Sequence, residues 1–251
     1  MASALLVEPQ INVFSNIIQH LVVFSEHIRI SVTPTECLVS AVNNSHTSLC
    51  NIKLEKEWFA EYMADTTITL IIHTSILYKI IHVLDDKHNI TLLFNTNELV
   101  VKGKSVQSDI VYTIPSLVIE IPEIDVPTDL EYAADISIPS KAWCSVLDHL
   151  MIIGDDCKLC LKEDSMNFTS QGDYGSTHID ITIEEMDSYV VEENIELNLE
   201  FHLKLLHIVS QFHKLSDVLE VHVSNDMPLV LQYNIAANSY IRFMIAPKIV
   251  D

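Results

Sequence analysis

The stretch Trp143-Cys144-Ser145-Val146-Leu147-Asp148-His149-Leu150 decides the fold, because a similar stretch occurs earlier in the chain. With Trp143 placed on Phe14 it falls on Phe14-Ser15-Asn16-Ile17-Ile18-Gln19-His20-Leu21, and most positions keep their residue class. No gap is needed through Val39 and Phe168, so the segments that follow superpose as well. We therefore interpret the chain as two copies of one structural unit.

A second pair of segments supports the repeat. The stretch Lys79-Ile80-Ile81-His82-Val83 matches Lys204-Leu205-Leu206-His207-Ile208. Lys79 and Lys204 are 125 positions apart, four fewer than the 129 positions between Phe14 and Trp143. Because the two pairs of segments occur in the same order and at similar offsets, we predict that each copy of the repeat contains a helix, strands, a second helix and further strands. Apolar residues spaced three and four apart predict helices at Phe14–Phe24, Thr74–Leu84, Lys141–Ile152 and Phe201–His213. Alternation of apolar and polar residues predicts strands at Ile28–Val32, Ile90–Phe94, Glu98–Lys102, Cys157–Leu161, His178–Thr182, Leu219–Val223 and Leu229–Tyr233.

The segment between the two copies is rich in proline and acidic residues. It runs over residues 115–139, with Pro115, Pro122, Pro127 and Pro139 along it. Proline removes backbone donors and stiffens an extended chain, which is typical of a connector. We predict an N-terminal domain over residues 1–122, an interdomain connector over 123–134 and a C-terminal domain over 135–251.

Composition excludes several classes of protein. The 251 residues carry 14 Lys and Arg against 35 Asp and Glu, a net charge of −21, but 49% are hydrophobic, which favours a packed core over a disordered acidic tail. Five cysteines, an odd number at low density, favour a reducing compartment. No apolar run reaches the roughly 18 residues of a membrane span, and we expect no signal peptide. The total charge alone argues against binding to nucleic acid.

Three further stretches carry a family resemblance. They are Ser45-His46-Thr47-Ser48-Leu49, then Met151-Ile152-Ile153-Gly154-Asp155 with Phe168-Thr169-Ser170-Gln171-Gly172-Asp173, and finally Met227-Pro228-Leu229-Val230-Leu231-Gln232-Tyr233 leading to Ile245-Ala246-Pro247-Lys248-Ile249. Together, and in this order, they resemble the sliding clamps of the proliferating cell nuclear antigen (PCNA) family. The similarity runs over essentially the whole chain.

The resemblance implies an α+β clamp fold, with two similar domains of antiparallel sheets and two helices each. Three such chains form a ring around duplex DNA, joined edge strand to edge strand at segments that match residues 108–114 and 177–184 here. Such a clamp is a nuclear polymerase processivity factor for DNA replication and repair. It has no catalytic residues, cofactor or metal, and an ATP-dependent clamp loader opens it.

The resemblance also implies a site for partner proteins. Family clamps bind a short motif, a glutamine followed by an aliphatic and two aromatic residues, in a pocket under the connector. Small and aliphatic residues suit such a pocket, since they leave an apolar hollow for an aromatic anchor. An alternative interpretation is that several of them only cap the edge of a core. The matching residues are Val42, His46, Thr47, Ile124, Val126, Pro127, Tyr132, Met227, Pro228, Met244, Ala246 and Pro247.

A sliding clamp needs positive charge toward phosphates rather than side chains that read bases. The residues that supply it on the expected helices are Lys79, His82, Lys204, His207, Lys214, His20 and His149. Neutral or acidic residues stand where the family tends to have Lys or Arg, and Asp148 repels phosphate. We expect a weakly basic channel in which histidines gain protons beside phosphate. The alternative is a solvated helix face without a ligand.

Two other functions remain open. The first is a specialised subunit of a hetero-oligomeric checkpoint or repair ring, an interpretation that agrees with the small number of basic residues expected to line the channel. A metal enzyme built on the twelve histidines is the more distant alternative, because no HExxH pattern occurs. Cys157 and Cys160 have CxxC spacing, but residues three apart on a strand face opposite sides, so we expect no shared metal there.

Overall fold

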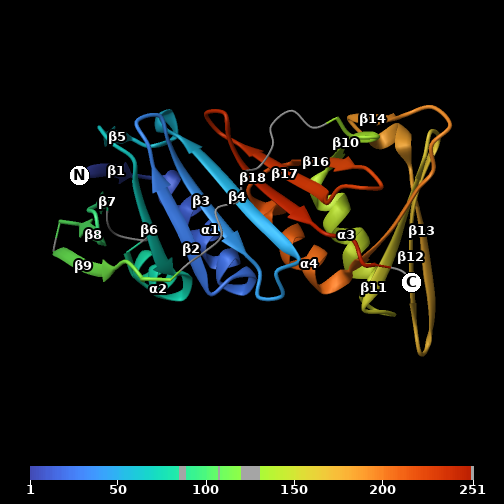
Figure 1. The fold of residues 1–251 in the computed structure, drawn as a ribbon, viewed down its shortest axis with the longest axis horizontal. Coiled ribbons are helices and arrows are strands. Elements are labelled where there is room, and N and C mark those ends of the chain that lie inside the picture. Colours follow the sequence, from blue (N-terminus) through green and yellow to red (C-terminus); the bar gives the residue numbers. More distant parts are fainter. Residues whose placement is uncertain (85–88, 107, 120–130, 250–251) are drawn as a thin grey trace. The chain divides into compact units, whose positions relative to one another are not determined.

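The computed structural model describes residues 1–84, 89–106, 108–119 and 131–249. The chain divides into two compact units, residues 1–124 with 235–241 (unit 1) and residues 125–234 with 242–251 (unit 2). Each unit combines antiparallel strands with two α-helices (Figure 1), which confirms the predicted α+β class. Most of the predicted connector lies outside the described residues, so the domain limits stay a prediction. In the described ranges no helix is long and apolar enough to cross a membrane.

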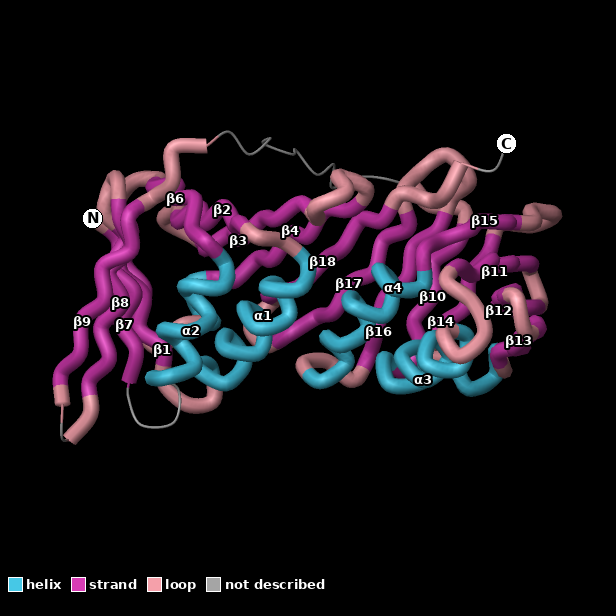
Figure 2. Tube along the Cα trace, turned by 90° about the horizontal axis from the view of Figure 1, so that it is seen from below, coloured by secondary structure: helices cyan, strands magenta, loops and turns pink. Residues whose placement is uncertain are grey.

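Unit 1 places two helices beside two runs of antiparallel strands. Its elements are β1 (Ala2–Leu6), α1 (Gln10–Phe24), β2 (His27–Val32), β3 (Glu36–Val42), β4 (Ser48–Glu55), the 3₁₀ helix η1 (Lys56–Trp58), β5 (Glu61–Ala64), β6 (Ile68–His73), α2 (Thr74–Leu84), β7 (Asn89–Phe94), β8 (Glu98–Lys104) and β9 (Asp109–Pro115). The strands follow the orders β5-β1-β7-β8-β9 and β4-β3-β2-β6. Figure 2 shows α1 and α2 side by side, and the core of this unit buries Ile18 and Leu77 completely.

Unit 2 repeats this plan. Its elements are β10 (Ala134–Pro139), α3 (Ser140–Leu150), β11 (Asp156–Lys162), β12 (Ser165–Gly172), β13 (Gly175–Ile181), the 3₁₀ helix η2 (Ile183–Glu185), β14 (Ser188–Val191), β15 (Leu197–His202), α4 (Leu203–Ser210), the 3₁₀ helix η3 (Gln211–Lys214), β16 (Val218–Val223), β17 (Leu229–Ile235) and β18 (Ser239–Ile245). Strands follow the orders β14-β10-β16-β17 and β13-β12-β11-β15. Helix α3 packs on α4, and Trp143 of α3 meets Phe168 of β12 edge to face, with ring centroids 5.3 Å apart.

The structure confirms the repeat and corrects one of its offsets. The run β4-β3-β2-β6 recurs as β13-β12-β11-β15, and the starts of β2 and β11 are separated by the same offset as Phe14 and Trp143. The starts of α2 and α4, Thr74 and Leu203, are separated by this offset too. The smaller offset that paired Lys79 with Lys204 is therefore wrong. An error of four positions is close to one helical turn of about 3.6 residues, so it leaves the apolar pattern almost unchanged.

Most predicted elements occur where the sequence placed them, and their ends differ. The helix at Thr74–Leu84 is confirmed at both ends, whereas α1 begins four residues before Phe14. The prediction of one helix over Phe201–His213 is wrong, because Phe201 lies in β15 and the last turn is the 3₁₀ helix η3. Buried Phe201 extends the helical spacing by chance, since a strand residue that faces the core is equally apolar.

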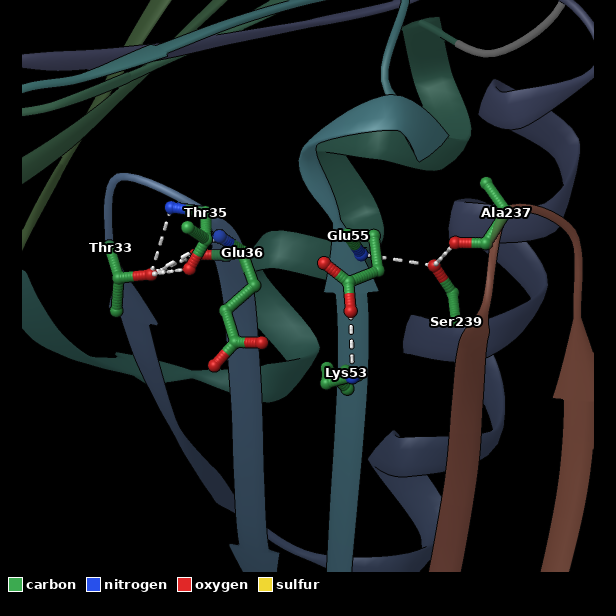
Figure 3. A network of polar contacts seen from close by, with 7 residues as sticks. All are labelled: Thr33, Thr35, Glu36, Lys53, Glu55, Ala237 and Ser239. Carbon is green, nitrogen blue, oxygen red and sulfur yellow. Dashed lines mark hydrogen bonds and ion pairs between the residues drawn. The ribbon is translucent and has the colours of Figure 1, made fainter.

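A late segment of the chain, residues 235–241, belongs to unit 1. The backbone N–H of Glu55 donates a hydrogen bond of 3.0 Å to Ser239 Oγ, as Figure 3 shows. Lys53 pairs with the Glu55 carboxylate at 2.7 Å and also lies over the ring of Tyr240, 5.4 Å from its centroid. These contacts attach the start of β18 to the unit that contains β4.

Candidate nucleic-acid interface and partner site

The helices of unit 1 supply little charge. α1 contains no Lys, Arg, Asp or Glu, and Lys79 is the one such residue of α2. Lys79 and His82 are both accessible, and the His82 ring stacks on Tyr78 with centroids 5.4 Å apart. His20 is only partly exposed, while Val83 is 65% exposed. The exposed helix residues of unit 1 are therefore more apolar than basic.

In unit 2, a histidine and a carboxylate of neighbouring helices contact each other. His207 Nε2 of α4 lies 3.0 Å from Asp148 Oδ1 of α3, and Gln211 Nε2 lies 3.3 Å from the same histidine nitrogen. The sequence placed Asp148 where it would repel phosphate, but did not predict this partner. Protonation of His207 would therefore first neutralise Asp148, so the pair adds little net positive charge.

The remaining predicted basic residues of unit 2 are exposed. Lys204 stands on α4, Lys214 on η3 and His149 on α3. Because α4 ends at Ser210 and the 3₁₀ helix η3 follows, Lys204 and Lys214 do not lie on one α-helix. The four helices and η3 together contain four lysines and one aspartate, a thin positive excess in a chain of net charge −21.

The first part of the predicted partner site is a turn in unit 1 that is held by hydrogen bonds between a side chain and the backbone. Asn43 is buried, and its Oδ1 accepts hydrogen bonds from the backbone N–H groups of Thr47 (2.9 Å) and Ser48 (3.0 Å). His46 adopts a φ of 57° and is exposed, as is Thr47, and Val42 is partly exposed at the end of β3. Asn43 was not among the residues predicted for this site, although asparagine and serine, as in Asn43-Asn44-Ser45, are typical turn residues.

The second part of the predicted partner site lies in unit 2. The Tyr132 ring packs on His222 with centroids 5.2 Å apart, and burial raises the pKa of Tyr132. The other members are accessible to differing extents. Met227, Met244 and Pro247 are partly exposed, and Pro228 and Ala246 are exposed. Ile124, Val126 and Pro127 lie outside the described residues, so their part in the site stays a prediction.

Lys248 fixes the segment that contains Ala246 and Pro247. Its backbone N–H donates to Glu200 O at 2.7 Å, and its Nζ lies 2.5 Å from Asp156 Oδ2 and 2.9 Å from Glu200 Oε1. His202 Nδ1 lies 2.6 Å from Asp156 Oδ1. Burial opposes ionisation of Asp156, but the hydrogen bonds from Lys248 and His202 outweigh it and lower the pKa of this carboxyl. The sequence identified Lys248 only as part of a family motif.

Two of the described strands that end a sheet, β9 and β13, coincide with the segments that the sequence predicted as edges. Among the described strands, β9 has only β8 as a neighbour and β13 has only β12. They cover the two segments predicted as edges, although β13 ends at Ile181 and a 3₁₀ helix replaces the rest of the predicted range. No residue of β13 is buried, and Val111 of β9 is 59% exposed. Both strands therefore present partly exposed apolar side chains beside open backbone groups.

The CxxC cysteines face opposite sides of β11, as predicted. Cys157 is buried, and burial together with Asp156 raises its pKa to about 12, which keeps the thiol protonated at neutral pH. Cys160 is partly exposed and donates to Glu196 Oε1 at 3.8 Å. The two sulfur atoms do not form a common ligand set.

Comparison with known proteins agrees with this architecture. The model of the proliferating cell nuclear antigen C-terminal domain matches residues 125–248, and the Rad9 model matches residues 14–116. The chain is also 27% identical over 222 residues to the proliferating cell nuclear antigen of Chaetomium thermophilum, a match that covers 85% of each chain. The Rad9 model therefore matches the first repeat of the chain, and the model of the C-terminal domain matches the second. The chain is therefore a divergent member of the proliferating cell nuclear antigen family of clamps.

Proposed function

We propose that this chain is a DNA sliding clamp, a processivity factor that encircles duplex DNA and recruits replication and repair enzymes. The observation that carries the proposal is that β9 of unit 1 and β13 of unit 2, each at the end of a sheet, coincide with the segments expected to join neighbouring chains, in a chain that contains one unit twice. A contact between unlike edges is head-to-tail, and it forms a closed ring when the rotations from copy to copy add up to a full turn. Three copies would give six similar units.

In this proposal the helices α1 to α4 face the DNA. Lys79, Lys204 and Lys214 are accessible and can approach phosphates without reading the sequence, which sliding requires. The thin positive excess means loose contact, so retention depends on ring closure rather than on affinity. An acidic exterior would also keep DNA from binding elsewhere on the ring.

The turn that Asn43 shapes in unit 1 and the segment that Lys248 anchors in unit 2 would each supply contacts to partner proteins that carry a short peptide motif. Both are held by side-chain hydrogen bonds, so little ordering entropy remains to be lost when a peptide binds. The protein would work in the nucleus as a scaffold without catalysis of its own, opened by an ATP-dependent loader.

Loading onto circular DNA tests this function. With a clamp loader and ATP, the protein should stay on nicked circular DNA at physiological salt and leave when the DNA is cut once. Failure to load, or loss from the intact circle as fast as from the cut one, would contradict topological linkage.

A subunit of a hetero-oligomeric checkpoint ring is the second candidate. The match of residues 14–116 to the Rad9 model favours it, as does the low charge of α1 and α2. The two functions differ in self-association. A heterotrimer subunit should remain a single chain of 28.4 kDa until other clamp subunits are added, whereas the self-closing clamp should trimerise alone.

A further inference from the structure

Two histidines and a glutamate meet where β2 begins and β6 ends. His27 and His73 are direct cross-strand partners, and their rings lie edge to face with centroids 5.2 Å apart. Glu26 immediately precedes His27 in the chain. The sequence could not bring these residues together, because the register of β2 with β6 joins positions that are far apart along the chain.

The side-chain atoms are spaced as metal ligands are. Glu26 Oε1 lies 3.4 Å from His73 Nε2 and 3.9 Å from His27 Nε2, and one ligand atom of each residue lies within 4.8 Å of the others. Zinc bonds of about 2.0 to 2.1 Å in a tetrahedron separate neighbouring ligands by about 3.3 Å. The distance between Glu26 and His73 is already close to this value, and small rotations of His27 would complete the set.

A neighbouring hydroxyl orients one of the imidazoles. Ser75 Oγ lies 3.2 Å from His73 Nδ1, which leaves Nε2 facing the Glu26 carboxylate. A hydrogen bond to the second ring nitrogen is the usual way in which proteins fix a metal-binding histidine. The cluster is open to small ions, since the Glu26, His27 and His73 side chains are 63%, 29% and 38% exposed.

The same place in the other repeat already holds a cation. Asp156 and His202 are the cross-strand pair that corresponds to His27 and His73, and the Lys248 ammonium group binds Asp156 there. In unit 1 the backbone N–H of Leu117 donates to Ile71 O, as that of Lys248 donates to Glu200 O. Leucine therefore stands in unit 1 where unit 2 has its lysine, and a second histidine replaces Asp156.

We propose that Glu26, His27 and His73 form a zinc-binding site in unit 1. The two imidazoles and the carboxylate supply three ligands, and water completes the tetrahedron. The ion would join the start of β2 to the end of β6, next to the first turn of α2, and would take the place that Lys248 fills in the other repeat. This site shares no residue with the proposed DNA and partner surfaces.

Zinc titration of the full chain tests the proposal. After removal of metal by chelation and dialysis, isothermal titration calorimetry with ZnCl₂ should give one site per chain. His73→Gln and Glu26→Gln should each lower the affinity at least tenfold. Ser75→Ala, which leaves all three ligands in place, should lower it by about 10- to 100-fold through the lost orientation of His73.

His222→Gln is the matched control. His222 also contacts a carboxylate on its direct cross-strand partner, Asp135, but the described residues place no second histidine beside this pair. The control should bind zinc like the unchanged chain, and circular dichroism should show that every variant is folded. No zinc binding by the unchanged chain, or equal loss in His222→Gln and His73→Gln, would overturn the proposed site.

Discussion

At the scale of single residues, Lys204 is the most informative member of the proposed DNA surface. It is exposed on α4 and no carboxylate pairs with it among the described contacts, unlike His207, which meets Asp148 at 3.0 Å. A lysine that contacts phosphate releases counterions when DNA binds, whereas a lysine elsewhere does not. This difference separates a DNA-facing lysine from an ordinary exposed one.

Lys204→Ala should weaken binding to duplex DNA of any sequence and flatten its dependence on salt. The slope of log K against log salt concentration should fall by about one for each bound lysine that is lost. Fluorescence anisotropy of a labelled duplex over a series of salt concentrations measures this slope. Lys102→Ala removes an exposed lysine from β8 and serves as the control. Equal slopes for Lys204→Ala and the unchanged chain would remove Lys204 from the DNA surface.

The bond between Asp156 and Lys248 should make the C-terminal segment sensitive to acid. The pKa of Asp156 is lowered in the folded chain, so its contribution to stability is present above the ordinary value of 3.8 and is lost as the pH falls through the folded value. The pKa of Lys248 is raised by its hydrogen bonds to Asp156 and Glu200, so its contribution lasts through neutral pH and is lost only above 10.5.

The Lys248 amide signal in two-dimensional NMR should therefore shift as the pH falls below about 4. Asp156→Asn should produce the shifted signal already at neutral pH. Asp180→Asn, which alters an exposed carboxylate paired with His178, should leave the signal in place. A Lys248 signal that is unchanged by Asp156→Asn would show that the carboxylate does not hold the segment.

At the scale of elements, the core of unit 2 depends on the contact of α3 with β12. Trp143 is 1% exposed and meets Phe168 edge to face. Trp143→Ala should lower the free energy of unfolding by about 3 to 5 kcal/mol, because it removes a large buried side chain and leaves a cavity. Urea unfolding followed by circular dichroism measures the change. Ile152→Ala, at a position 75% exposed just after α3, should change it by less than about 0.5 kcal/mol.

The open edge of β9 should be essential for self-association. Val111→Lys places a charge on this strand and should weaken the ring at least tenfold, since lysine on an edge opposes strand pairing. Val190→Lys is a closely matched control. Val190 is 60% exposed, against 59% for Val111, and lies on β14, an edge with no predicted partner. Sedimentation velocity over a concentration series compares the two. Equal weakening by both variants would argue against β9 as the interface.

The sequence predicted the elements whose pattern is local. The helix over Thr74–Leu84 and the strand over Leu219–Val223 follow from spacing within a few residues, and the repeat follows from comparing the chain with itself. Contacts between distant segments were not predictable. The pairing of His27 with His73 and of Asp148 with His207 depends on strand register and helix packing, which no local spacing encodes. Phe201 was misassigned because strands and helices bury the same apolar residues.

At the scale of the whole molecule, the net charge of −21 is the feature least like that of a DNA-binding protein. The proposed ring would resolve this, because only its lining has to attract phosphate, whereas the total charge of the chain is carried mostly by its exterior. The exposed lysines on the helices and the open edges on β9 and β13 both fit that arrangement. All of this rests on the closure of the ring.

Multi-angle light scattering of the purified protein alone tests that closure most directly. The self-closing clamp predicts a single species with three times the chain mass of 28.4 kDa. A constant mass of 28.4 kDa at every concentration up to the highest soluble one would contradict the self-closing ring.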